Sequence, residues 1–221
     1  MKNTILTLIL LIALGNICSA QYNNWNSNNS EKRNAVFVNF GYNYGLTLDV
    51  GYNRSLEIVK PVILGFDFSV PMGKNIFDDH KLKIGGEVDL FKYKAIHISA
   101  KIKGVIRGYD SEYVQIENFG GDFGLTAGYY KPTWYIAGDF GFDKAITSYL
   151  KHSELFKKIY PLLQDGWYTP TGGQFYYGLN SGFSIKDIFD ISVKAGLTNA
   201  QEDDTNAMLP YYAQLGMTFN F

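Results

Sequence analysis

The chain has 221 residues, with 20 Lys and Arg against 21 Asp and Glu and a formal net charge of −1 at pH 7. This balance does not supply the basic stripe of a nucleic-acid-binding protein. The chain holds 17 Tyr, 16 Phe and 3 Trp beside 23 Gly and only 6 Pro, so the arrangement of its apolar residues decides its class.

The first 20 residues have the layout of a secretory signal peptide. Lys2 precedes an apolar run over 5–14, too short to span a bilayer as a helix, and the small residues Ser19-Ala20 end the segment. Cys18 also suggests a lipid-anchor signal, but the residue before it suits that signal poorly, so cleavage after Ala20 is favoured. Since Cys18 is the single cysteine, the mature chain would have no disulfide or thiolate metal site.

Residues 21–34 form a polar Asn/Ser tract, which we expect to be a disordered leader. Beyond it, ten segments alternate between apolar and polar side chains, the pattern of a transmembrane β-barrel. In the first of them Val36, Val38 and Phe40 alternate with Phe37 and Asn39. The segments are 35–44, 46–53, 62–70, 82–90, 96–104, 122–129, 134–142, 175–183, 191–198 and 211–221.

A soluble β-sandwich also alternates, but its polar face meets water and carries Lys, Glu and Thr, whereas glycine weakens a strand. Here the polar faces are rich in glycine, which suits a crowded barrel lumen. Aromatic residues gather at the segment ends, as in the girdles at two bilayer interfaces. One set is Phe91, Tyr93, Tyr130, Trp134, Phe219 and Phe221, and the other is Tyr42, Tyr44, Phe142, Phe175 and Tyr211. We therefore predict an all-β, antiparallel up-and-down transmembrane barrel over 35–221, with about ten strands and eight as the alternative.

The connections between these segments alternate between short and long. The short set is 54–61, 92–95, 130–132 and 185–189, and the long set is 71–81, 108–121, 144–173 and 199–209. Outer-membrane barrels have short periplasmic turns and longer outer loops, so we assign the short set to the periplasm.

The signal peptide, the alternation and the final Phe221 give the chain its resemblance to small Gram-negative outer-membrane β-barrel proteins. The resemblance implies contact with outer-membrane lipid, a periplasmic leader at 21–34, and insertion by the barrel-assembly machinery. In that family a last strand with a terminal aromatic resembles the assembly signal, which fits Met217, Phe219 and Phe221. It leaves function open, because such barrels serve as channels, anchors, adhesins and enzymes.

A barrel of this size has little room inside, since about eight strands enclose only packed side chains and open channels need about 16 to 18. The polar faces predict an inward network of Asp49, Asp67, Lys83, Glu87, Asp89, His97, Lys101, Lys103, Arg107, Asp122, Asp139 and Lys194. A mixed network of this kind more often packs a lumen than forms a substrate path. The favoured hypothesis is a monomeric, non-catalytic, surface-exposed structural, accessory or partner-binding protein, with a small porin-like solute channel as the alternative.

The sequence contains no HExxH, GxSxG or phosphate-loop motif, and its histidines lack metal-ligand spacing, so we predict no cofactor. Asp78-Asp79-His80 and His152 with Glu154 resemble the acidic and histidine residues at the rim of omptin proteases, which are ten-stranded barrels. A rim-loop hydrolase is therefore a further alternative to solvated loops.

The longest outer connection, 144–173, contains a helix candidate with Ser153 as its N-cap. Its apolar positions are Phe156, Ile159, Tyr160 and Leu163. We expect this helix to pack over the barrel mouth; the alternative is a lid or a partner site that uses Trp167 and Tyr168. The acidic stretch 201–205 is expected to be a solvated loop rather than a cation site.

Overall fold

The computed structural model describes residues 24–25, 32–73, 76–170, 172–201 and 209–221. The expected signal peptide at 1–20 and most of the acidic stretch at 201–205 lie outside these residues. The elements are β1 (Asn34–Tyr42), β2 (Leu46–Glu57), β3 (Pro61–Pro71), β4 (Asp79–Tyr93), β5 (Ile96–Asp110), β6 (Val114–Tyr130), β7 (Trp134–His152), α2 (Glu154–Ile159), β8 (Gly166–Tyr168), β9 (Gly173–Ile185), β10 (Phe189–Ala200) and β11 (Tyr211–Asn220). In the described part of the chain, no helix has the length and apolarity needed to cross a membrane.

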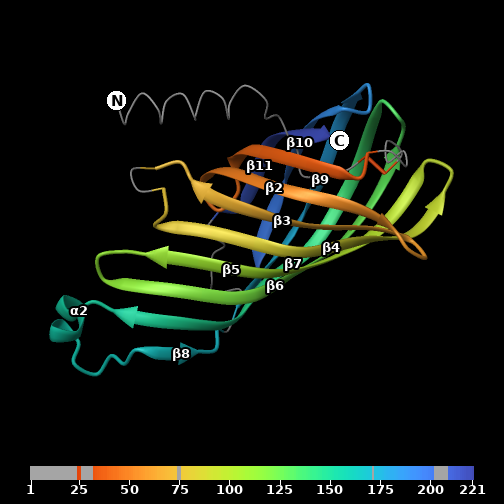
Figure 1. The fold of residues 1–221 in the computed structure, drawn as a ribbon. Coiled ribbons are helices and arrows are strands. Elements are labelled where there is room, and N and C mark those ends of the chain that lie inside the picture. The colour runs from red at the N-terminus through yellow and green to blue at the C-terminus, as the bar shows by residue number, and fades with distance from the viewer. Residues whose placement is uncertain (1–23, 26–31, 74–75, 171, 202–208) are drawn as a thin grey trace, which may run out of the picture.

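The strands close into a barrel (Figure 1). Strands β1 to β7 pair antiparallel in chain order, β7 then pairs with β9, and β9, β10 and β11 follow. β11 pairs with β1 from Ala35↔Asn220 to Tyr42↔Ala213, which completes the ring. Of the 11 strands in the sheet, β8 pairs only with β7 and lies outside the ring, which leaves ten. The predicted antiparallel up-and-down barrel is confirmed.

The apolar face of the barrel is outside and the polar face is inside. On β11, Leu215 is 61% and Met217 is 41% exposed, whereas Gln214 and Thr218 are 7% and 0% exposed. The same reversal runs round the barrel, where Asp49, Asp67, Asp89, Asp122 and Asp139 are all buried. A soluble sandwich buries its apolar face, so this arrangement excludes the sandwich alternative.

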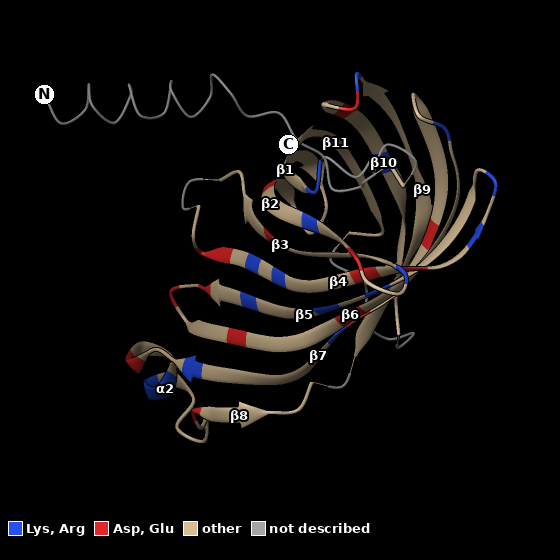
Figure 2. Ribbon diagram, turned by 45° about the vertical axis from the view of Figure 1, so that its right-hand side comes forward, with Lys and Arg blue, Asp and Glu red and all other residues tan. Residues whose placement is uncertain are grey.

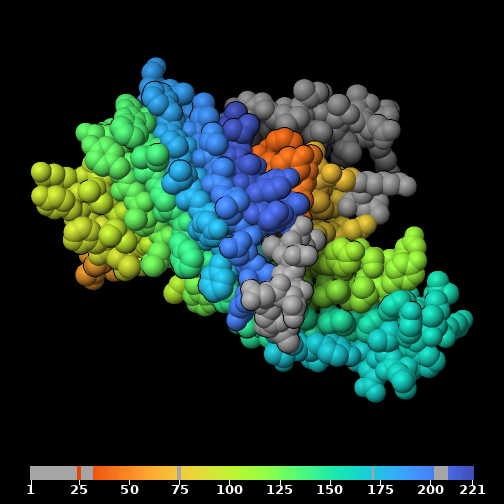
Figure 3. Space-filling view, turned by 180° about the vertical axis from the view of Figure 1, so that it is seen from behind, coloured from red at the N-terminus to blue at the C-terminus, as the bar shows by residue number. Residues whose placement is uncertain are grey.

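The two ends of the barrel differ. Asn34 and Phe221 lie together at one end, here called the terminal end, where their backbones exchange hydrogen bonds of 3.0 and 2.9 Å. The strand connections at this end are 58–60, 94–95, 131–133 and 186–188. The connections at the opposite end, the loop end, are 43–45, 72–78, 111–113, 153–172 and 201–210. The longest of these carries α2 and β8, which project from the body of the molecule (Figure 3).

Two of the expected long loops are shorter than predicted. The expectation of a loop over 108–121 is wrong, because β5 continues to Asp110 and β6 begins at Val114. β7 likewise continues to His152 and pairs with β6 throughout, with an irregularity between Phe119 and Gly120. Strands β5 to β7 therefore extend past the other strands toward α2 (Figure 2).

Two girdle assignments are also wrong. Tyr130 is 1% exposed and lies in the lumen, because it shares the inward parity of Gly128 and Thr126 on β6. The Tyr44 hydroxyl donates to the carbonyl of Ser69 at 3.0 Å, and the Tyr44 ring contacts the guanidinium of the inward-facing Arg107. Tyr44 therefore lies at the loop-end mouth and not on the outer surface.

Candidate functional site: the charged lumen

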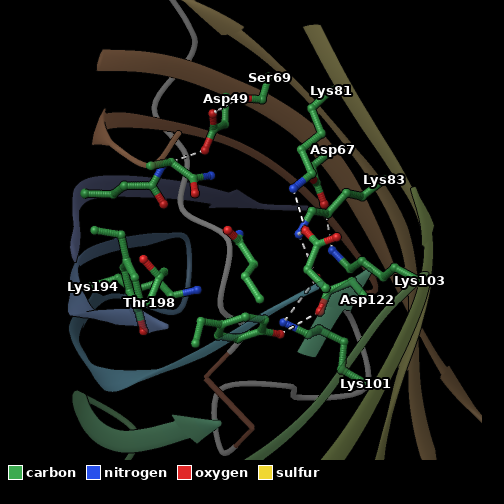
Figure 4. A pocket seen from close by; sticks show the side chains of 16 residues that line it. Asp49, Asp67, Ser69, Lys81, Lys83, Lys101, Lys103, Asp122, Lys194 and Thr198 are labelled. Atoms are coloured by element: carbon green, nitrogen blue, oxygen red, sulfur yellow. Dashed lines mark hydrogen bonds and ion pairs between the residues drawn. The ribbon is translucent and has the colours of Figure 1, made fainter. Parts of the chain in front are cut away.

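The loop-end half of the lumen contains a cavity of about 60 Å³ with charged walls (Figure 4). Strands β2 to β7 and β9 to β11 each contribute inward residues to it, because alternate side chains of a strand point to the same face. The residues that line it include Asp49, Asp67, Lys81, Lys83, Lys101, Lys103, Asp122, Asp143, Tyr176, Lys194, Tyr212 and Gln214. Small residues leave room for these side chains: a Cβ at Gly141 would lie 2.2 Å from the Tyr176 ring.

Three close ion pairs cross the wall formed by β3 to β7. Lys103 Nζ lies 2.7 Å from the Asp67 carboxylate. Lys83 Nζ lies 2.6 Å from Asp122, and Lys81 Nζ lies 2.5 Å from Asp143. These side chains are mostly buried, so their charges are poorly screened by water and each depends on its partner.

Asp122 is the centre of this wall. Its carboxylate is 1% exposed, accepts a hydrogen bond from the Tyr176 hydroxyl at 2.6 Å, and lies 3.8 Å from Lys101 Nζ as well as against Lys83. The ammonium groups of Lys101 and Lys194 both lie over the Tyr176 ring, at 5.0 and 5.7 Å from its centroid. One carboxylate and one aromatic ring thus hold cations from three different strands.

The other carboxylates of this half have mainly neutral partners. Asp49 accepts hydrogen bonds from the Ser69 hydroxyl and from the Gln214 amide, the latter at 2.6 Å. Asp139 accepts a hydrogen bond of 3.3 Å from the Tyr212 hydroxyl and lies 3.7 Å from Lys194 Nζ.

The predicted network divides into two groups. Asp49, Asp67, Lys83, Lys101, Lys103, Asp122, Asp139 and Lys194 meet in the loop-end half. Arg107 lies nearer the mouth, where it pairs with Asp79. Glu87, Asp89 and His97 lie toward the terminal end, where His97 Nδ1 is 2.7 Å from Asp89 and Ser99 donates to Glu87. The prediction missed Lys81 and Asp143, which continue the inward parity of β4 and β7 one step beyond the segments recognised from the sequence.

The terminal end of the lumen is filled by aromatic rings. The Tyr130 and Tyr135 rings stack at 5.5 Å, and His97 meets Tyr130 edge-on at 5.4 Å. Trp25 stacks on His97 and is buried, and so is its neighbour Asn24. For these two residues the structure differs from the expected disordered leader.

The residues of the predicted rim hydrolase do not come together. Asp79 forms a two-pronged ion pair with Arg107 at 2.7 and 2.9 Å, and His80 Nδ1 lies 3.3 Å from the carbonyl oxygen of Phe77. His152 instead faces Asp165 at 3.2 Å. Registered pairing places His80 three strands away from β7, or about 14 Å by the usual strand spacing. Among the described residues, no three His, Cys, Asp or Glu side chains are grouped to hold a metal ion.

The helix in the longest connection is confirmed, but it ends at Ile159, so Leu163 lies outside it. Its expected packing over the barrel mouth is wrong, because α2 lies at the far ends of the projecting strands (Figure 1). The Ser153 side chain caps α2 by accepting a hydrogen bond from the Phe156 N–H. The Phe156 ring packs on Tyr113 at 5.7 Å and on His152 at 6.0 Å, so α2 contacts the projecting strands next to it. Trp167 of β8 packs beside Tyr149 and is 63% exposed.

Asp165 ties this segment to β7. The backbone N–H of His152 donates to the Asp165 carboxylate at 2.8 Å, and Lys157 Nζ donates to it at 2.7 Å. These donors, the His152 N–H first, lower the pKa of the Asp165 carboxyl to about 2.

The residues proposed as an assembly signal lie on the outer face. Met217 and Phe221 are 41% and 49% exposed. The Phe219 ring packs between Phe189 at 5.3 Å and Phe221 at 5.7 Å. Phe219 and Phe221 thus form an aromatic patch at the terminal end of β11, the strand that lies between β10 and β1.

No protein-family model matches the sequence, and no curated protein is similar to it. The chain nevertheless matches solved structures. The outer membrane protease OmpT from Escherichia coli matches with a TM-score of 0.52 and 9% identity, over 86% of this chain and 97% of that chain. A KdgM porin matches with a TM-score of 0.43 and 6% identity, over 85% of this chain and 99% of that chain. At 9% identity the likeness to OmpT shows the barrel fold alone and nothing about activity.

Proposed function

We propose that this protein is an integral outer-membrane barrel with a plugged lumen and a non-catalytic, surface-exposed structural or partner-binding role. The observation that carries the proposal is the inverted barrel: large apolar side chains such as Leu125 and Leu215 are more than half exposed, while paired charges are buried inside. Surrounding lipid stabilises the exposed apolar side chains, and pairing with opposite charges stabilises the buried ones.

The terminal end faces the periplasm and the loop end faces outward. Short turns at the end that holds both termini, and long connections at the other, support this orientation. Export by a cleavable signal peptide and insertion by the barrel-assembly machinery, guided by Met217, Phe219 and Phe221, are parts of the same proposal.

The projecting strands and the α2–β8 segment form the surface that a partner would contact outside the cell. Leu155, Ile159, Leu162 and Trp167 are all 58% or more exposed there. A group of exposed apolar side chains on one segment is typical of an interaction site. The barrel ring itself is complete and needs no second copy.

Planar bilayer recordings test the plugged lumen. We expect no steady conductance from the wild-type protein, because ion pairs fill the loop-end half and aromatic rings fill the terminal end. Combining Lys101→Ala with Glu87→Ala, which removes one charge from each half, should open at most a small leak. Large, stable steps from the wild type would refute the plugged lumen and favour a small solute channel.

The rim-hydrolase alternative comes from the His and acidic residues of the loop end, which the structure holds apart. It is tested by activity against peptides and lipids with His80→Ala and His152→Ala as variants. We expect no activity in the wild type; activity that either substitution abolishes would replace the non-catalytic proposal with a rim hydrolase.

A further inference from the structure

Asn24 and Trp25 lie inside the terminal end of the barrel, although they belong to a tract of Asn and Ser. Asn24 is 0% and Trp25 is 6% exposed. Deep burial of an indole and a carboxamide requires matching contacts, because an unpaired buried amide is costly.

The contacts of Asn24 come from two separate parts of the barrel wall. Its side-chain amide donates to the carbonyl oxygen of Lys131 at 2.7 Å and to that of Pro132 at 3.5 Å, both in the turn between β6 and β7. It also donates to the Ser184 hydroxyl on β9 at 3.0 Å. Three acceptors therefore converge on one NH₂ group and satisfy both of its N–H bonds, which a side chain without a donor could not do.

The Trp25 indole completes an aromatic layer. It stacks on His97 with ring centroids 6.3 Å apart and 12° between the planes. Tyr130, Tyr135, Ile63 and Ala137 form one buried cluster with it. These residues come from β3, β5, β6 and β7, so the layer reaches across the lumen rather than along one wall.

Two buried polar atoms beside Trp25 have no hydrogen-bond partner among the described residues. They are His97 Nε2 and Asp89 Oδ1. Both residues line a cavity of about 130 Å³ beside Trp25, together with Glu57 and Lys92. If the indole left, water could take its place and form hydrogen bonds with His97 Nε2 and Asp89 Oδ1. Release of the indole therefore leaves no additional buried polar atom without a partner here.

We propose that the terminal end of the lumen is a binding site for a peptide segment with a carboxamide followed by an indole, occupied in cis by Asn24-Trp25. The occupied site closes this end of the lumen. The proposal uses the barrel orientation given above but not the absence of conductance, and the two are measured separately.

The first test follows Trp25 alone. The chain has 3 tryptophans, so Trp134→Phe and Trp167→Phe leave Trp25 as the single reporter. We expect blue-shifted emission and weak quenching by acrylamide. Asn24→Ala removes the hydrogen bonds and should raise the open population about tenfold, with stronger quenching. Asn199→Ala, the same change at an exposed position at the opposite end of the barrel, should have no effect.

The second test supplies the segment in trans. A barrel that carries Asn24→Ala, Trp25→Ala, Trp134→Phe and Trp167→Phe, and so lacks both the tryptophans and the cis occupant's side chains, is titrated with a synthetic peptide of residues 21–33. Peptide emission should shift to the blue and saturate, and a peptide with Asn24→Ala should bind about tenfold more weakly. Heat-modifiable gel mobility confirms that each barrel is folded.

The proposal is overturned by either of two results. One is quenching of Trp25 in the folded protein as strong as in the unfolded chain. The other is peptide binding that does not exceed binding to protein-free vesicles. A wild-type barrel that conducts while Trp25 stays protected would refute the plugged lumen and leave the peptide site standing.

Discussion

An arginine on the outer face should cost most near the middle of the bilayer, and the spacing of residues along β11 provides a depth scale. Leu215 lies midway between Tyr211 and Phe219, four residues from each on the same face. Four residues span about 14 Å of strand, or about 10 Å of depth at the usual tilt, so Leu215 lies near the midplane of an apolar band about 25 Å tall. Leu197 pairs directly with Tyr211 and lies at the outer interface.

Leu215→Arg should therefore lower the free energy of unfolding by about 2–4 kcal/mol, whereas Leu197→Arg should cost about 0–1 kcal/mol. The two variants should thus differ by about 2–3 kcal/mol, which is about a 30- to 150-fold change in the ratio of folded to unfolded protein. Urea unfolding from thin lipid vesicles, followed by tryptophan fluorescence, measures both variants. The two replace the same residue type on the same face, so only depth separates them. Equal losses for both would refute a hydrocarbon environment for this face.

Three further predictions concern Phe221, the lumen and the α2–β8 segment. Deleting Phe221 should cost a few kcal/mol at most in refolding, yet deplete the protein from the outer membrane; heat-modifiable mobility reports both, and failure to refold in vitro would assign Phe221 to packing. Asp122→Ala should cost about 3–5 kcal/mol in urea unfolding because it strands buried Lys83, whereas Asp122→Leu with Lys83→Met should cost less, since only the Tyr176 hydroxyl and the more distant Lys101 then lose a partner; equal costs would contradict the pairing. Since the pKa of Asp165 is lowered to about 2, its contacts are complete above about pH 4 and are lost as the pH falls. Proteolysis of 153–168 by pepsin should therefore increase between pH 4 and 2 in the wild type, whereas Asp165→Asn should be cut readily at both; equal resistance at the two pH values would contradict the tether.

The period of two predicted the barrel because lipid outside and a packed polar lumen inside enforce it on every membrane strand. Gln214 inward and Leu215 outward follow from parity alone. The projecting strands were missed because that constraint ends with the bilayer. On β6 beyond the barrel, the outward Gln115 and Glu117 are polar and exposed, while the inward Ile116 is half-buried. Where water replaces lipid, the outward side chains of this strand are polar and the inward one is apolar. A pattern search for apolar outward residues therefore predicts a loop there.

The position of Trp25 could not be predicted for a different reason. Its neighbours are Asn and Ser, which indicate disorder in any local reading. Its partners His97 and Tyr130 are far away in the chain and come together only when the barrel has formed. The ion pairs were predictable as a set, but the choice of Lys103 rather than the registered neighbour Lys83 for the 2.7 Å contact with Asp67 depends on side-chain packing.

The mutual hydrogen bonds of Asn34 and Phe221 make the barrel a ring with no structurally privileged first strand. A circular permutant would join residue 221 to residue 34 by a short linker and open the chain at 186–188. It would keep every strand pairing of the ring, including β9 with β10, and lose only the turn that connects those two strands. Its new ends would lie at the same end of the barrel as the natural ones, and its last strand would be β9, which carries the outward Phe183 near its end. Such a chain separates the order in which strands are synthesised from the order in which they meet in space, so its insertion would report whether the assembly machinery reads a strand by its position in the chain or by its neighbours.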